Sequence, residues 1–276
     1  MQRMQNKILM AGPSITKHEI DKVNKMMNDG WDSYQYVEEF EERFAEYHPR
    51  KYCLMTSCCT HAIHLGLLGL GLKEDDEVIV PECTWTGSVA PITYIGCKPV
   101  FVDISLENWC MEYESIVNAI TDKTKAILCV DLYGFIPNYG KLEALAKSKG
   151  ITLIEDAAES LGSSLDGKKA GTFGKFSVHS FHRTKTITTG EGGALLLDDK
   201  KIFQRCKMLR DHGRHPWTKD LFNEEFSFKY MPSNLQSSLA CSQLKKIKLL
   251  LKLKRNIFLN YKKYLKKIEK EILMNE

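Results

Sequence analysis

Lys185 and Asp156 are the residues of this sequence whose types and surroundings are best suited to chemistry. Lys185 lies in a segment rich in hydroxyl and glycine residues, Ser180–Gly193, and Asp156 ends the apolar run that begins at Leu153. A pyridoxal phosphate (PLP) site needs an amine that holds the aldehyde as a Schiff base. It also needs a carboxylate that keeps the pyridine nitrogen protonated. We therefore interpret Lys185 and Asp156 as a catalytic pair.

Each residue alone also permits a purely structural interpretation. Lys185 could lie in a solvated glycine-rich turn, and Asp156 could cap a helix. Because the pair occurs together with further motifs along the chain, the combination favours a cofactor site over two unrelated structural residues.

Together these segments resemble the DegT/StrS-type sugar aminotransferases, PLP enzymes of the aspartate aminotransferase-like (type I) fold. The resemblance runs from about Ala11 to the end of the chain. Within the family it is greatest to nucleotide-sugar 4-aminotransferases of the perosamine- and viosamine-synthase type. It implies that Lys185 forms the Schiff base and that Asp156 faces the pyridine nitrogen.

The segment around Thr60 resembles the turn in which this family binds the cofactor phosphate. Backbone N–H groups at a helix start form such anion sites, and the resemblance adds the hydroxyls of Thr60 and Ser180. Relatives usually have Ser-Gly-Thr where this chain has Cys58-Cys59-Thr60, so the turn must accept a residue with a Cβ at Cys59. A plain helix N-cap by Ser57 or Thr60 is the alternative.

Two further residues are assigned to the cofactor ring by the resemblance. Trp85 follows the apolar run Val78–Pro81 and is expected to stack on the ring, although a tryptophan can also be simple core. Glu159 lies three residues after Asp156, one helical turn along if a helix begins there. The resemblance places Glu159 near the phenolic oxygen of PLP.

Two more residues, His182 and Lys229, each have a functional and a structural interpretation. His182 lies three residues before Lys185 and is a possible substrate contact, with a packed or hydrogen-bonded histidine as the alternative. Lys229 stands where many relatives carry asparagine, in a segment that the resemblance implies reaches the neighbouring subunit's cofactor phosphate in a homodimer. The alternative for Lys229 is an exposed lysine without a ligand.

Composition is consistent with a cytoplasmic enzyme. The 276 residues are 43% hydrophobic, and no apolar run approaches the roughly 18–20 residues of a membrane span. The start, residues 1–7, is followed by too short an apolar stretch for a signal peptide. Nine cysteines without a C-x-x-C pair predict reduced thiols and no metal site. Of these, Cys58 and Cys59 are expected to favour the thiolate, because they lie near a helix N-terminus.

Apolar runs alternate with helical patterns and predict a mostly parallel, doubly wound α/β domain. Ligands of such sheets bind at the carboxyl ends of the strands, and both Asp156 and Trp85 follow strand candidates. A capping box at Thr16–Glu19 predicts a helix through Met27. The expected strands are Lys51–Thr56, Val78–Pro81, Pro99–Asp103, Ala126–Asp131 and Ile151–Glu155, and further helices are expected over Phe40–Tyr47 and Gly140–Ser148.

We divide the chain into an N-terminal helical segment (1–48), a PLP-binding large α/β domain (49–243) and a basic helix (244–276). Residues 245–276 hold 11 Lys or Arg and 3 Glu, and their pattern fits one long helix with an apolar face. A solvated connecting helix is favoured over a nucleic-acid or membrane-surface role. Relatives continue into a small C-terminal domain, so the chain could be a fragment, half of a split protein or a natural short form.

The resemblance implies a transaminase that moves an amino group from L-glutamate to a nucleotide-linked 4-keto-6-deoxy sugar. The product would be a 4-amino-4,6-dideoxy sugar nucleotide. A PLP-dependent sugar dehydratase is a second possibility, which Lys185 disfavours because such dehydratases tend to lack this lysine. A catalytically inactive scaffold that kept the fold is a third possibility. A nucleic-acid-binding protein that uses the basic segment is a fourth.

Overall fold

The computed structural model describes residues 14–215 and 222–266; the expectation for residues 1–7 and the end of the basic segment lie outside them. The helices are α1 (Lys17–Asp29), α2 (Gln35–Tyr47), α3 (Cys59–Leu70), α4 (Thr86–Tyr94), α5 (Tyr113–Ala119), α6 (Tyr139–Lys149), α7 (Lys200–Arg210), α8 (Asn234–Lys245) and α9 (Ile247–Leu265), with the short turn η1 (Leu132–Gly134). The strands are β1 (Tyr52–Thr56), β2 (Glu77–Pro81), β3 (Lys98–Val102), β4 (Thr124–Val130), β5 (Thr152–Asp156), β6 (Ser164–Leu165), β7 (Lys168–Lys169), β8 (Phe176–Ser180) and β9 (Gly193–Leu197).

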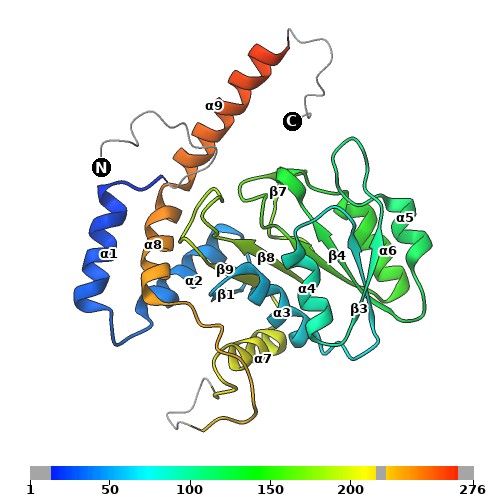
Figure 1. Ribbon diagram of the computed structural model, residues 1–276, viewed down its shortest axis with the longest axis horizontal. Coiled ribbons are helices and arrows are strands. Elements are labelled where there is room, and N and C mark those ends of the chain that lie inside the picture. Colours follow the sequence, from blue (N-terminus) through cyan, green and yellow to red (C-terminus); the bar gives the residue numbers. More distant parts are fainter. Residues whose placement is uncertain (1–13, 216–221, 267–276) are drawn as a thin grey trace.

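A seven-stranded sheet with helices on both faces organises the molecule (Figure 1). Its strand order is β1-β9-β8-β5-β4-β2-β3. Strands β3, β2, β4, β5 and β8 run parallel, whereas β9 is antiparallel to both of its neighbours. This is the type I fold, and the expectation of a mostly parallel α/β sheet is confirmed.

The predicted strands correspond to β1 to β5 with boundaries that differ by at most two residues. The apolar residues of β1, β2, β4 and β5 are buried, as expected for strands covered on both faces, whereas Phe101 on the edge strand β3 is exposed. Strands β8 and β9 were not predicted, because they flank the glycine-rich segment that holds Lys185. The predicted capping box opens α1, where both the backbone N–H and the hydroxyl of Thr16 donate to Glu19.

Helix α3 lies close against the sheet because it carries a glycine at the contact. A Cβ added to Gly66 would lie 2.4 Å from the ring of Phe176 on β8, so only glycine fits there. Phe176 is fully buried, and it belongs to the core cluster that also holds Leu65 of α3 and Leu195 of β9. This contact fixes α3 over the strands that flank the Lys185 segment.

On the opposite face, α2 and α8 hold the residue that enters the Lys185 segment. The ring of Phe181 packs edge-on against Phe40 and Phe44 of α2, with centroids 5.2 and 5.4 Å apart. Cys241 and Leu244 of α8 complete this cluster. The aromatic contacts therefore anchor the lysine segment to the helices that precede the sheet.

The long basic helix expected from residue 244 forms as α9, but it begins at Ile247, because residues 244 and 245 belong to the end of α8. Between them Lys246 has φ −104° and ψ 13°, and its Nζ lies 2.7 Å from the buried carboxylate of Glu19. Although burial opposes it, the contacts with Lys246 and Thr16 lower the pKa of Glu19 to about 2. The break lets both Leu244 and Ile247 reach the core.

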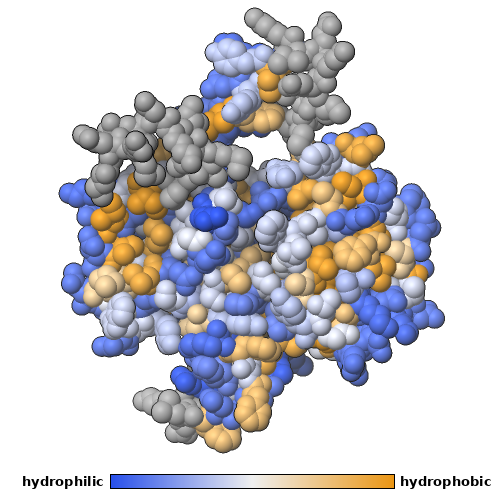
Figure 2. Space-filling view, viewed as in Figure 1, coloured by the Kyte–Doolittle hydropathy of each residue, from blue (hydrophilic) through white to orange (hydrophobic). Residues whose placement is uncertain are grey.

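Beyond its first turns, α9 projects away from the sheet, and basic and apolar side chains alternate along it (Figures 1 and 2). Leu251 packs on Gly162 in the loop after β5, so the start of α9 lies beside the carboxyl end of that strand. Among residues 14–215 and 222–266, none of the helices combines the length and apolar character that crossing a membrane requires. The proposed domain boundaries stay a prediction.

Two buried histidines pack against each other near the end of α2. The rings of His48 and His179 are 4.5 Å apart, and the Nε2 atom of His48 has no hydrogen-bond partner. Burial lowers the pKa of His48 to about 3, helped by the charges of Lys169 and Arg50, and burial also holds the pKa of His179 well below its usual value. Both rings are therefore neutral in the folded protein.

We expect His48 to make the protein sensitive to mild acid. The unfolded chain binds a proton on this histidine below about pH 6.5, and the folded chain does so only near pH 3, so stability falls as the pH drops through this window. Between pH 7 and pH 5 the loss from His48 alone is about 2 kcal/mol. Urea unfolding of the wild type and of His48→Leu at several pH values measures it. The difference between the two unfolding free energies should change by that amount, and parallel curves would contradict the account.

Candidate active site

A pocket of about 310 Å³ opens at the carboxyl ends of the parallel strands, where doubly wound sheets bind their ligands. It receives residues from the segments after β4 and β5, from the segment after β8 and from α9. Its lining residues are Tyr133, Ala158, Glu159, Leu161, Ser180, Thr184, Lys185, Thr186 and Lys254.

Lys185 and Glu159 form an ion pair in this pocket. The Lys185 Nζ donates to Glu159 Oε1 at 2.9 Å, and the N–H of Tyr133 donates to Oε2 at 2.9 Å. Burial would raise the pKa of Glu159, but the hydrogen bonds from Lys185 and Tyr133 outweigh it and lower the pKa. Glu159 is therefore a carboxylate at neutral pH, held between a lysine and a backbone amide.

The helix that would place Glu159 one turn beyond Asp156 does not form. The chain after β5 is a series of turns instead, in which the N–H of Ala157 bonds to Val178 of β8 and that of Ser160 bonds to Ala157. The bond to β8 continues the sheet past Asp156 and prevents a helix from starting there. The turns nevertheless bring Glu159 into the pocket.

Asp156 is buried at the end of β5 beside the pocket. Its carboxylate accepts hydrogen bonds from the Ser88 hydroxyl at 2.7 Å and from the Ala158 N–H at 3.1 Å. Burial raises the pKa of Asp156, and these two bonds, together with the nearby charge of Lys185, oppose the shift. Because both donors are neutral, a cationic group placed against this carboxylate would be bound strongly.

The start of α3, the end of β8 and the start of β9 meet at one point. Gly193 pairs with Thr56 of β1 and with Ser180 of β8. A Cβ on Gly193 would lie 2.5 Å from the nitrogen of Cys59 and 2.6 Å from the carbonyl oxygen of Cys58. The backbone amides at the α3 N-terminus therefore lie next to Ser180, an arrangement that suits a phosphate.

Thr60 and the cysteines occupy the first turn of α3. The N-cap is Cys58, rather than Ser57 or Thr60. A Cβ on Gly87 at the start of α4 would lie 2.8 Å from the Thr60 hydroxyl, so α3 and α4 begin side by side. The expectation that Cys58 and Cys59 favour the thiolate is wrong. Burial raises the pKa of Cys58 and raises the pKa of Cys59 well above its usual value. Burial outweighs the helix N-terminus here.

Trp85 is not a core residue. It is the N-cap residue of α4, and 81% of its surface is exposed. Its ring is therefore available to a ligand, and the stacking role remains a prediction.

His182 does not line the pocket. Its ring contacts Thr184 at 3.0 Å and approaches Glu191 at 3.6 Å.

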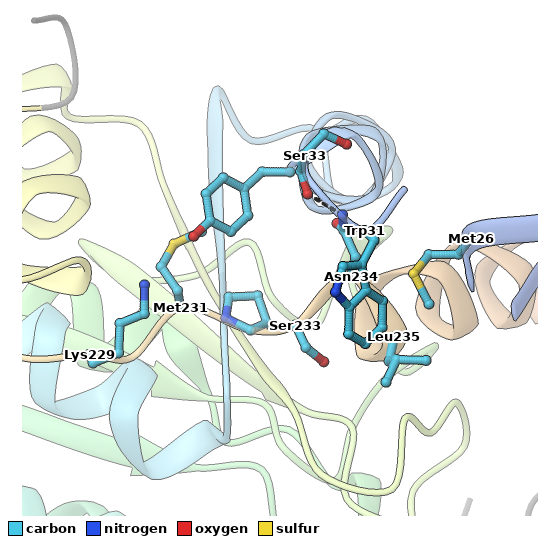
Figure 3. A pocket seen from close by; sticks show the side chains of 10 residues that line it. Met26, Trp31, Ser33, Lys229, Met231, Ser233, Asn234 and Leu235 are labelled. Atoms are coloured by element: carbon cyan, nitrogen blue, oxygen red, sulfur yellow. Dashed lines mark hydrogen bonds between the residues drawn. The ribbon is translucent and has the colours of Figure 1, made fainter. Parts of the chain in front are cut away.

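Lys229 lies at a different cavity, of about 330 Å³, between α1, α2 and the start of α8 (Figure 3). Its Nζ pairs with Asp211 at 2.5 Å. The cavity also has Trp31 and Asn234 in its wall, and the Asn234 amide donates to the carbonyl oxygen of Ser33. Within one chain Lys229 therefore does not reach the Lys185 pocket, and a contact with a neighbouring subunit stays a prediction.

The residues present fit pyridoxal phosphate. An amine lies in the pocket, a buried carboxylate with two neutral donors lies beside it, and a close approach that only glycine permits brings the start of α3 near Ser180. Sequence reasoning missed Ser88, Tyr133 and Lys254 as site residues. Ser88 could have been found in the first turn of the helix after Trp85, and Tyr133 by its place after β4. Lys254 had no comparable local signal.

Replacing Gly193 should damage the cofactor site more than the fold. In Gly193→Ala the new Cβ must displace the α3 N-terminus, which costs about 1–3 kcal/mol of stability and should weaken PLP binding by roughly tenfold or more. The matched control is Gly190→Ala, at φ +82° with open space around it, which strains the backbone by about 1–2 kcal/mol. Absorbance titration with PLP should separate the two variants. Equal PLP affinity in both would exclude the Gly193 approach as a cofactor determinant.

The DegT/DnrJ/EryC1/StrS aminotransferase family matches residues 13–276. The chain is 40% identical to GDP-perosamine synthase of Escherichia coli O157:H7 over 257 residues, which cover 91% of this chain and 69% of that protein.

Solved structures give the same result. The Helicobacter pylori aminotransferase PseC, involved in pseudoaminic acid biosynthesis, has a TM-score of 0.88 at 27% identity, over 94% of this chain and 71% of its own. A GDP-4-keto-6-deoxymannose-3-dehydratase with a trapped PLP–glutamate geminal diamine has a TM-score of 0.81 at 29% identity, over 87% and 68%. The chain thus spans about two thirds of the length of these relatives. It belongs to the DegT/DnrJ/EryC1/StrS aminotransferase family, whose cofactor is pyridoxal phosphate.

Proposed function

We propose that the protein transfers an amino group from L-glutamate to a nucleotide-linked 4-keto-6-deoxy sugar, giving the 4-amino-4,6-dideoxy sugar nucleotide. The observation that carries the proposal is the ion pair of Lys185 with Glu159 in a pocket that adjoins the buried Asp156. A lysine that is paired with one carboxylate and lies near a second, more deeply buried one is an arrangement suited to proton transfer.

When bound, pyridoxal phosphate supplies an aldehyde that accepts the amino group and a ring that withdraws electrons. In the proposed site Asp156 faces the ring nitrogen and holds a proton there, since its buried carboxylate is stabilised by a cation. Ser180 and Thr60, with the α3 amides, bind the phosphate group. Trp85 orients the ring by stacking, with its exposed face turned to the ligand.

Lys185 holds the cofactor and moves protons. Its Nζ would accept the proton from the substrate carbon that carries the nitrogen and would deliver it to the cofactor's aldehyde carbon on the other side of that nitrogen. Glu159 keeps the Lys185 side chain in position through the 2.9 Å bond. The side chain is therefore ordered before the reaction begins, and no entropy has to be lost for this during the reaction. Leu161 and Thr186 form the remaining walls and limit the entry of water.

The charges of the pocket suit anionic substrates. Lys254 reaches the pocket from α9, and burial together with the charge of Lys185 lowers its pKa while Glu159 opposes the shift. A cation in this place can bind the carboxylate of L-glutamate or the phosphates of a nucleotide sugar.

We further propose a cytoplasmic homodimer, in which Lys229 serves the neighbouring site. The nine free cysteines suit a reducing compartment.

A sugar dehydratase is the second candidate within the family, since one of the similar structures is a dehydratase. Lys185 favours the aminotransferase, because the amine needed to hold the cofactor is present in the pocket. An inactive scaffold has no need for the Lys185–Glu159 pair, which holds two charged groups at a partly buried site.

The donor half of the reaction tests the proposal. The wild type with PLP should show the visible absorbance band of lysine-bound cofactor, and L-glutamate should bleach it with release of 2-oxoglutarate. Lys185→Ala should lack both the band and the bleaching, whereas Lys123→Ala, which removes an exposed lysine before β4, should keep them. An unchanged band in Lys185→Ala would remove Lys185 from the site, and a wild-type band that ignores every amino-acid donor would refute the aminotransferase.

Ser88 is expected to control the charge of Asp156. In Ser88→Ala the carboxylate loses the donor that lowers its pKa, so Asp156 should protonate at a higher pH. The acid side of the pH profile of the glutamate half reaction should therefore move to higher pH, and PLP affinity should fall by roughly tenfold. Ser88→Thr keeps the hydroxyl and should restore the wild-type profile. Identical profiles for the wild type and Ser88→Ala would contradict this role.

A further inference from the structure

Two aromatic residues beside the pocket have a backbone conformation that large side chains rarely adopt. Trp109 has φ 58° and Tyr133 has φ 53°, both in the left-handed region. Their rings touch, with centroids 5.8 Å apart and planes inclined at 62°. Backbone strain of this kind is retained where surrounding contacts enforce it, and it gathers at ligand sites.

Hydrogen bonds around Tyr133 account for its strained backbone. Its N–H donates to Glu159 at 2.9 Å, and Gly134, at φ 94°, donates to Asp131 at 3.3 Å. Asp131 is buried and also accepts from the Ser160 hydroxyl at 2.7 Å. The backbone of Tyr133 is therefore fixed between the Glu159 carboxylate and the turn closed by Gly134 and the Asp131 carbonyl oxygen, and the direction of its ring is set by the same residue that pairs with Lys185.

Trp109 is fixed by a separate loop. Its N–H donates to Ser105 at 2.8 Å, and Ser105 in turn donates to the carbonyl oxygen of Cys110 at 2.8 Å. The side chain of Cys110 is buried, so the loop is anchored at the residue next to the tryptophan. Trp109 thus meets Tyr133 from one side and leaves much of the tyrosine ring uncovered.

Burial within the chain does not compensate this strain. The Tyr133 side chain is 66% exposed and that of Trp109 is 39% exposed, although Tyr133 lines the pocket that contains Lys185. An exposed aromatic ring that is held rigidly at a pocket mouth offers a flat surface for a ligand at little further cost in entropy. Such a surface suits a planar aromatic group.

We propose that Tyr133, supported by Trp109, is the stacking platform for the nucleobase of the nucleotide-sugar acceptor. The inference rests on the proposed function. A pocket of about 310 Å³ is at the lower limit for a small-molecule site, so the cofactor and the sugar fill it and the nucleoside lies outside against its mouth. Lys254 also lines the pocket and is placed to meet the intervening phosphates.

The donor substrate does not need this platform. L-Glutamate has no planar aromatic group, so the Tyr133 ring should contribute to binding of the nucleotide part of the acceptor. A variant that removes the ring and keeps the backbone tests the contribution of the ring alone. Tyr133→Asn suits this purpose, because asparagine tolerates the left-handed region and keeps the N–H that bonds to Glu159. Tyr133→Phe keeps the ring.

The test is calorimetric binding of GDP, UDP, dTDP and inorganic pyrophosphate to the PLP-loaded protein. The wild type should bind at least one of the nucleoside diphosphates more tightly than pyrophosphate. Tyr133→Asn should weaken that nucleotide by about tenfold, or about 1.4 kcal/mol, whereas Tyr133→Phe stays near the wild type. Pyrophosphate affinity should be the same in all three proteins, because pyrophosphate has no base to stack on the ring.

Three results would overturn the inference. Equal nucleotide affinity in the wild type and Tyr133→Asn would exclude the platform, as would a wild type that binds no nucleoside diphosphate. Pyrophosphate affinity that falls in Tyr133→Asn as much as the nucleotide affinity would make Tyr133 a support for the pocket instead. Failure of the proposed function is distinct, because it would appear as a wild type without the glutamate half reaction whatever its nucleotide affinity.

Discussion

The carboxylate of Glu159 is the interaction on which the rest of the site depends. One of its oxygens holds the Lys185 amine and the other holds the backbone of Tyr133. Lysine and tyrosine come from segments after different strands, β8 and β4, so this single side chain joins two of the loops at the carboxyl end of the sheet. The lysine in turn keeps Glu159 ionised despite its partial burial. The ion pair therefore fixes the position of the Lys185 amine and the charge of the Glu159 carboxylate at the same time.

Close contacts at glycine determine where these loops can lie. Gly66 lets α3 rest on Phe176, and Gly193 lets the first turn of α3 approach the end of β8. A helix N-terminus is thereby held beside Ser180 by packing forces that act on both sides of the sheet. The same side of the molecule carries the turns after β5, against which Leu251 of α9 packs. The anion site and the lysine pocket are consequences of how the helices dock.

The sequence was most informative where a signal was local. Strands β1 to β5 are continuous apolar runs, and Lys185 and Asp156 lie in segments with a recognisable pattern. The helix expected after Asp156 failed because a backbone bond to β8, a distant partner, replaced the local preference. Lys254 and Tyr133 could not be predicted together, because only the packing of α9 brings them to one pocket. The assigned roles of Trp85 and Lys229 still await a test.

The central claim is that Asp156 and Lys185 form one cofactor site, and the protonation state of the bound ring tests it most directly. The nitrogen chemical shift of PLP labelled with ¹⁵N in the ring can be measured in the wild type and in Asp156→Asn. The account predicts a protonated ring nitrogen in the wild type and a neutral one in the variant, since the amide lacks the negative charge. A neutral nitrogen in the wild type, or the same shift in both proteins, would contradict it.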